Sequence, residues 1–139
     1  MDPLTIIASA IAVGQAGDRL TGLLLKAKRL LEAPDEVDGL VNEIADLNLV
    51  LSSLRSAVSE IRRLSDSDSH NTYSLSKLVE ACGSIILNLE GLVAYSFSTP
   101  SGKVDRVSWA RKKTKVEKLR LRLRELKSAL AVHLASINS

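Results

Sequence analysis

Apolar residues recur every three or four positions along most of this chain. The most regular stretch lies between residues 35 and 64, where the steps alternate between three and four without a slip. Its apolar positions are Val37, Leu40, Ile44, Leu47, Leu51, Leu54, Val58 and Ile61. Val41, Leu49 and Val50 widen this stripe beyond the narrow seam of a dimeric coiled coil. The pattern therefore favours a helix that packs into the core of a bundle.

Two later stretches repeat the same period and predict two more helices. Residues 73–95 carry Leu75, Leu78, Cys82, Ile85, Leu89 and Leu92, with Val79, Ile86 and Val93 alongside. Residues 108–137 carry Trp109, Val116, Leu119, Leu123, Leu126, Leu130, Leu134 and Ile137. The polar segments 65–72 and 96–102 separate these helices and are expected to be loops, since serine, proline and glycine favour turns.

The first stretch differs from the others because it has no charged residue between Asp2 and Asp18. Asp2 can cap a helix and Pro3 suits its first turn, so a helix is expected over residues 3–32. Gly14 and Gly17 would allow either a bend or the close approach of a neighbouring backbone. A helix that is apolar nearly all round is either buried or meant for a membrane, and its pattern does not decide between these roles.

These periods predict an all-α fold, an antiparallel four-helix bundle with a long first helix that can bend near Gly14. The helices are expected at residues 3–32, 35–64, 73–95 and 108–137. No segment alternates between polar and apolar residues as a strand would. We interpret residues 1–139 as a single domain and expect it to be one module of a longer multidomain protein.

Composition supports a folded domain: 45% of the 139 residues are apolar and 25% are charged. Cys82 is the single cysteine, and we expect it to be a core residue. No lysine or arginine precedes the first apolar run, which argues against a secretory signal. No window reaches the roughly 20 apolar residues of an ordinary transmembrane helix, so an intracellular protein, soluble in at least one state, is expected.

Positive charge is concentrated near the start of the last helix. Residues 103–127 contain eleven lysines or arginines and three acidic residues, a net charge of +8, while the whole chain carries +3. This segment can be a solvated helix face, a contact with anionic lipids, or a nucleic-acid surface. Trp109 is the only aromatic residue there, too few for base stacking, so no nucleic acid is expected. The candidate lipid contacts are Arg111, Lys112, Lys113, Lys115 and Lys118.

No motif for catalysis, metal binding or cofactor binding is found. The segment from Gly14 to Gly17 lacks the lysine and the preceding strand of a phosphate-binding loop. His70 and His133 lie far apart, and neither has a neighbour at metal-ligand spacing. We therefore predict a protein that is not an enzyme and that has no catalytic residue, metal or cofactor.

The chain resembles the HeLo-like N-terminal domains of fungal STAND proteins, the NOD-like receptor analogues of filamentous fungi. The resemblance rests on several short segments that occur in the same order. The first of these segments is Met1-Asp2-Pro3-Leu4, followed by Ile7, Ala8, Ser9, Ile11, Ala12 and Val13. The resemblance continues through Ala33-Pro34 and the helix with Leu40, Glu43, Ile44, Leu47 and Leu51. It ends with Val107-Ser108-Trp109, Lys112-Lys113 and Val116-Glu117-Lys118-Leu119.

This resemblance implies a module of programmed cell death, innate immunity or heterokaryon incompatibility, similar in architecture to the executioner domains of mixed-lineage kinase-like proteins and to plant coiled-coil resistance receptors. Such a domain forms a homo-oligomer and targets or permeabilises the plasma membrane, with downstream receptor domains as further partners. It would be cytoplasmic at rest. Carried over by position, the membrane-inserting residues are Leu4, Ile6, Ile7, Ile11 and Val13. The alternative is an interaction or regulatory module of a STAND receptor without membrane activity.

Overall fold

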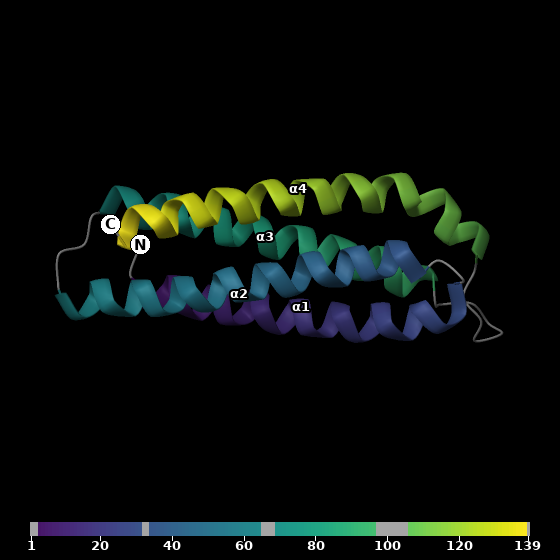
Figure 1. The fold of residues 1–139 in the computed structure, drawn as a ribbon, viewed down its shortest axis with the longest axis horizontal. Coiled ribbons are helices and arrows are strands. Elements are labelled where there is room, and N and C mark those ends of the chain that lie inside the picture. Colours follow the sequence, from purple (N-terminus) through teal and green to yellow (C-terminus); the bar gives the residue numbers. More distant parts are fainter. Residues whose placement is uncertain (1–2, 32–33, 65–68, 97–105, 139) are drawn as a thin grey trace.

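Four long helices make up the described part of this computed structural model, which covers residues 3–31, 34–64, 69–96 and 106–138. They are α1 (Pro3–Leu31), α2 (Pro34–Leu64), α3 (Ser69–Ser96) and α4 (Arg106–Asn138). Figure 1 shows them lying lengthwise beside one another, with successive helices running in opposite directions and both termini at one end. The prediction of an all-α fold with four helices is confirmed.

The helices form a square in cross-section. α1 packs mainly against α2 and α3, and α4 packs against the same two helices from the other side. The core between them contains the predicted apolar stripes: every predicted α2 position from Val37 to Val58 is buried, as are Val116, Leu123, Leu126 and Leu130 of α4. The side chains of Ile61 and Trp109 lie outside the described residues.

The ends of the helices differ slightly from the sequence prediction. α3 begins at Ser69, four residues before the expected start at Tyr73, within the segment expected to be a loop. The reason is that serine and asparagine, which favour turns, also favour the first positions of a helix. The predicted cap at Asp2 lies outside the described residues, as do residues 65–68 and 97–105 of the two expected loops.

Close approach between helices accounts for Gly17. A β-carbon at this position would lie 3.1 Å from Cγ2 of Ile44 and 3.3 Å from Oδ1 of Asn48, both on α2. α1 is helical through Gly14 and Gly17. Of the two roles open from the sequence, Gly17 takes the packing role, because it leaves room for α2.

Burial of the apolar first half of α1 is one-sided, so in the folded bundle this helix is neither enclosed all round nor fully exposed. Ile6, Ala10 and Val13 are buried, and Ile7 is half-buried. Leu4 and Ile11, however, are 45% and 39% exposed. The physical reason is the square arrangement: a helix at one corner contacts two neighbours, and its outer side faces solvent.

Candidate functional site: three surfaces around α1 and α4

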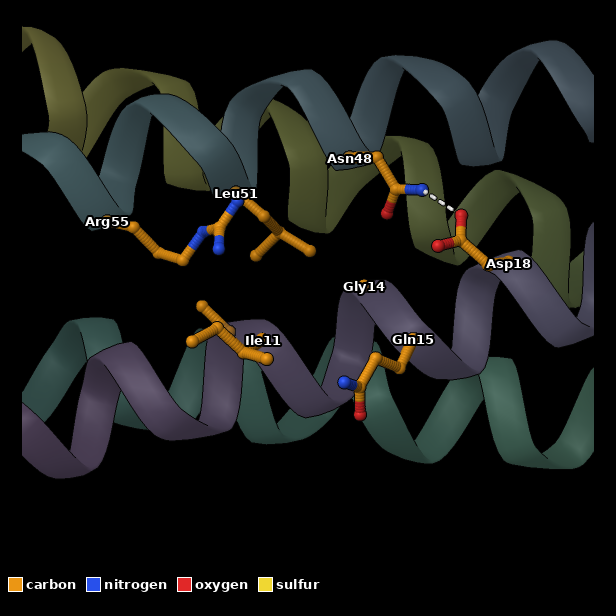
Figure 2. A pocket seen from close by; sticks show the side chains of 8 residues that line it. Ile11, Gly14, Gln15, Asp18, Asn48, Leu51 and Arg55 are labelled. Atoms are coloured by element: carbon orange, nitrogen blue, oxygen red, sulfur yellow. Dashed lines mark hydrogen bonds between the residues drawn. The ribbon is translucent and has the colours of Figure 1, made fainter.

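A hollow lies between the middle of α1 and the middle of α2, and we call it the α1/α2 hollow. It has a volume of about 230 Å³ and is lined by Ala10, Ile11, Gly14, Gln15, Asp18, Asn48, Leu51 and Arg55. Figure 2 shows Ile11 on α1 facing Leu51 and the long side chain of Arg55 on α2. At one end, Asn48 Nδ2 donates a hydrogen bond to Oδ1 of Asp18 at 3.3 Å.

One buried polar atom beside this hollow has no hydrogen-bond partner among the described residues. Asn48 Oδ1 is inaccessible to solvent and accepts no hydrogen bond from the described residues. A buried acceptor without a donor costs roughly 1–3 kcal/mol. The α1/α2 interface therefore contains one buried acceptor whose loss of hydration is not offset by a donor from the described residues.

A second surface joins α2 to α4 through ion pairs, and we call it the ionic seam. It consists of Glu36, Glu43 and Asp46 on α2 and Lys113, Arg124 and Lys127 on α4. Glu43 is its centre: the residue is only 6% exposed. Arg124 donates from Nε and Nη2 to its two carboxylate oxygens at 3.3 and 3.4 Å, and Lys127 Nζ donates at 3.1 Å.

The charge balance of the seam lowers the pKa of Glu43. Burial alone would raise this pKa, but the hydrogen bonds and positive charges of Arg124 and Lys127 outweigh burial and hold the pKa below its ordinary value of 4.5. Glu36 likewise forms an ion pair with Lys113 near the start of both helices. The seam therefore attaches α4 to α2 with groups that are charged at neutral pH.

Beside the seam, Gly39 of α2 leaves room for the side chain of Arg120 on α4. A β-carbon there would lie 3.3 Å from Cζ and Nη1 of Arg120, so the guanidinium group of α4 occupies the space that a side chain would take. Arg120 Nη1 also donates to Oε1 of Glu117 at 3.0 Å. The sequence spacing could have indicated this surface. Glu36 and Glu43 are seven residues apart, as are Lys113, Arg120 and Lys127, and residues seven apart lie on one face of a helix.

The seam predicts a specific dependence of stability on pH. Glu43→Gln should lower the free energy of unfolding by about 2 kcal/mol at pH 7, because two cations lose a buried carboxylate partner. A carboxylate with a depressed pKa stabilises the fold above its unfolded pKa, and this contribution is lost as pH falls through the folded pKa. The difference between the two proteins should therefore shrink below about pH 4.5, measured by urea unfolding.

Glu125→Gln is the matched control for this measurement. Glu125 pairs with Arg122 on the exposed side of α4, with 69% of its side chain exposed, so its loss should change stability by less than about 1 kcal/mol. Equal effects of the two substitutions, or a Glu43→Gln effect that is unchanged at about pH 3, would contradict the assignment of Glu43 as the centre of the seam.

The third surface is a line of positive charge on the other side of α4, which we call the basic stripe. Arg111, Lys115, Lys118 and Arg122 follow one another at steps of four, three and four, so they share a helix face. This face borders α3, because Lys115 lines a groove with Leu87 and Gly91. Within the described part of the chain, Arg111, Lys115 and Lys118 form no ion pair, while Arg122 pairs with Glu125.

The five predicted lipid contacts therefore divide between two sides of α4. Arg111, Lys115 and Lys118 lie together on the basic stripe and are exposed. Lys113 lies on the opposite side, in the seam, where hydrogen bonding to Glu36 raises its pKa. Lys112 is half-buried.

The cysteine and the two histidines noted in the sequence lie away from these three surfaces or outside the described side chains. Cys82 is fully buried, as expected, and burial raises the pKa of its thiol to about 12. His133 is half-buried on α4, and its Nδ1 donates to the carbonyl oxygen of Ala129 at 3.0 Å. The side chain of His70 lies outside the described residues.

Comparisons with known proteins yield no relative: no family model, curated protein or solved structure matches this chain. Among the described residues, no helix is both long and apolar enough to cross a membrane. The same part of the chain contains no group of three or more histidine, cysteine or acidic residues able to hold a metal ion.

Proposed function

We propose that this chain is a non-enzymatic effector module of cell death or innate immunity that oligomerises at anionic membranes. In this proposal the basic stripe holds the bundle at the lipid surface, and α1 leaves the bundle to insert. The module would be cytoplasmic at rest and would move to the plasma membrane on activation. Its further partners would be other copies of the same chain and the downstream domains of a receptor.

The observation that carries this proposal is the placement of the first half of α1. It is uncharged from Pro3 to Gly17, packs on one side only, exposes Leu4 and Ile11, and borders the α1/α2 hollow. A helix with these features loses fewer contacts on release than a helix enclosed on all sides would. Leaving the bundle still exposes Ile6, Ala10 and Val13, which is unfavourable in water and must be offset by lipid or partner helices.

The length of the uncharged segment supports insertion by several copies together. At about 1.5 Å per residue, its fifteen residues extend roughly 22 Å, short of the roughly 30 Å thickness of bilayer hydrocarbon. One copy would not span the bilayer unless charged residues after Gly17 were also drawn in. Assembly of neighbouring copies would shield those residues, so oligomerisation belongs to the proposed mechanism.

The division of charge on α4 supports the proposed orientation at the membrane. The seam neutralises cations on the α2 side, while the basic stripe leaves its cations exposed on the α3 side. Each lysine or arginine near an anionic leaflet contributes roughly 1 kcal/mol to binding. The stripe is therefore the part of α4 best suited to meet phosphate or carboxylate headgroups.

This orientation is tested by the double substitution Lys115→Gln and Lys118→Gln. Loss of two cations from the stripe should weaken binding to phosphatidylserine vesicles about thirtyfold at low ionic strength, measured by co-sedimentation. The control is the double substitution Lys26→Gln and Lys77→Gln. It lowers the net charge by the same amount as the stripe variant, but on α1 and α3. Equal loss in both proteins, or no preference of the wild type for anionic over zwitterionic vesicles, would contradict the membrane role of the stripe.

A second candidate function, an interaction module without membrane activity, is favoured by the α1/α2 hollow. The exposed apolar Ile11 beside the half-buried Arg55 could receive a partner helix that supplies an apolar residue. This function predicts partner binding that persists when the stripe is neutralised. The stripe variant therefore separates the two candidates.

A further inference from the structure

A groove runs between the second half of α3 and the first half of α4. We call it the α3/α4 groove; it has a volume of about 320 Å³ and is lined by Leu87, Asn88, Gly91, Leu92, Lys115 and Leu119. This volume lies at the lower end of the range of small-molecule sites. Its walls are mostly apolar, and Leu87 is 57% exposed in the folded domain.

Gly91 keeps the groove open. A β-carbon at this position would meet no heavy atom within 4 Å, so neither packing nor close approach of a neighbouring helix requires glycine here. A glycine in a helix interior costs roughly 1 kcal/mol relative to alanine. At position 91 the helix is therefore less stable than it would be with alanine, and the absence of a side chain leaves space beside the groove.

Charge defines what the groove can bind. Lys115 lines the groove itself, and Arg111 and Lys118 lie one turn away on the same face of α4. The charged residues that the structure describes on α3 nearest this region, Glu80 and Glu90, contact Lys77 and Arg19 respectively. The site therefore combines an apolar floor with a positively charged rim.

We propose that the α3/α4 groove binds an anionic lipid, taking one acyl chain against Leu87, Leu92 and Leu119 and placing the phosphate at Lys115. This inference rests on the proposed membrane function and adds to it a site for an individual lipid. General attraction to an anionic surface needs only exposed cations. A groove beside them selects a molecule that has an apolar chain as well as a negative headgroup.

The test uses decanoyl lysophosphatidic acid as the probe, below the concentration at which it forms micelles, with binding to the folded wild-type chain measured by calorimetry. Saturable binding is expected. Glycerol phosphate has the headgroup without the chain, and decanoyl glycerol has the chain without the charge. Each of these should bind at least tenfold more weakly. Binding of glycerol phosphate as tight as that of the full probe would reveal a plain phosphate site and overturn the proposal.

Gly91→Leu is the decisive variant, and Gly22→Leu is its matched control. Both glycines are in helices and both have open space around the missing β-carbon, but Gly22 lies on α1, away from the groove. Both substitutions should preserve folding, because leucine is the better helix former. Only Gly91→Leu should weaken binding of the lysophosphatidic acid, by at least tenfold, while phosphatidylserine vesicles still bind through the stripe.

Two more variants keep the result unambiguous. Leu87→Gln removes one exposed wall of the groove and should also weaken probe binding, and Lys115→Gln should weaken it about fivefold. Unchanged affinity in both Gly91→Leu and Leu87→Gln would overturn the groove while the membrane function stands. A wild type that binds neither anionic vesicles nor the probe would instead overturn both proposals.

Discussion

Substitution of Ile11 by aspartate is expected to abolish dye release from anionic vesicles while leaving the bundle folded. Ile11 lies in the uncharged part of α1 and is 39% exposed at rest, so a carboxylate there stays near water in the folded domain. In the inserted state the same carboxylate would enter hydrocarbon, at a cost of roughly 3 kcal/mol per copy. In an oligomer this cost is added for every copy, so we expect dye release to be lost completely and not merely slowed.

Leu49→Asp is the matched control for this prediction. Leu49 is an exposed leucine on α2, with 69% of its surface accessible, and it has no role in insertion in the proposed mechanism. It should leave dye release unchanged. Circular dichroism and gel filtration must show that both variants fold and oligomerise as the wild type does. Equal loss of release in both variants, or wild-type oligomers that release no dye, would contradict insertion by α1.

The choice of Ile11 depends on information that the sequence does not contain. Periodicity places Ile6, Ile7, Ile11 and Val13 in one apolar run, and by pattern alone they are equivalent. The structure separates them, since Ile6 and Val13 are buried and Ile11 is not. Aspartate at Ile6 would unfold the bundle and leave its membrane role untested. Which side of a helix faces a neighbour depends on the arrangement of all four helices, and this is a tertiary property.

The fold itself was predictable because one physical signal dominates it. The unbroken alternation of three- and four-residue steps in residues 37–58 corresponds to a buried stripe on α2, and the stripes of α1, α3 and α4 meet it in the core. In α3 the prediction was less accurate. Leu78 and Leu92 of the predicted stripe are half-buried, while the flanking Val79, Ile86 and Val93 are buried. The period identifies the helix, but a small rotation about its axis decides which residues reach the core.

The candidate sites were predictable only in part. A surplus of positive charge in α4 is evident from composition, but its division into a neutralised and an exposed side is not. Charges seven residues apart suggest a seam, as with Glu36 and Glu43, yet only the packing shows that Glu43 is buried. The roles of Gly39 and Gly91 were inaccessible for the same reason. Gly39 makes room for Arg120, and Gly91 leaves a groove open. In the sequence both are glycines within helices, and nothing there distinguishes their roles.

Release of α1 from the bundle is the central step of the proposed mechanism, and a reversible cross-link tests it most directly. A β-carbon at Gly83 on α3 would lie 3.2 Å from Cγ2 of Val13 on α1. Cγ2 is one bond from Val13 Cβ and is the only α1 atom within 4 Å, so the two β-carbons lie roughly 4.0–4.7 Å apart, at the upper end of the roughly 3.5–4.5 Å that a disulfide needs. Val13→Cys and Gly83→Cys would therefore join α1 to α3, with Cys82→Ala removing the competing thiol.

The measurement is dye release from anionic vesicles by this double-cysteine protein before and after a reductant is added. We predict no release from the oxidised protein and release at the rate of the Cys82→Ala parent once the disulfide is reduced. Binding of the oxidised protein to the vesicles should persist, because the basic stripe on α4 is untouched. Release by the oxidised protein at the same rate as the reduced one would contradict the account, since α1 would then have no need to leave the bundle.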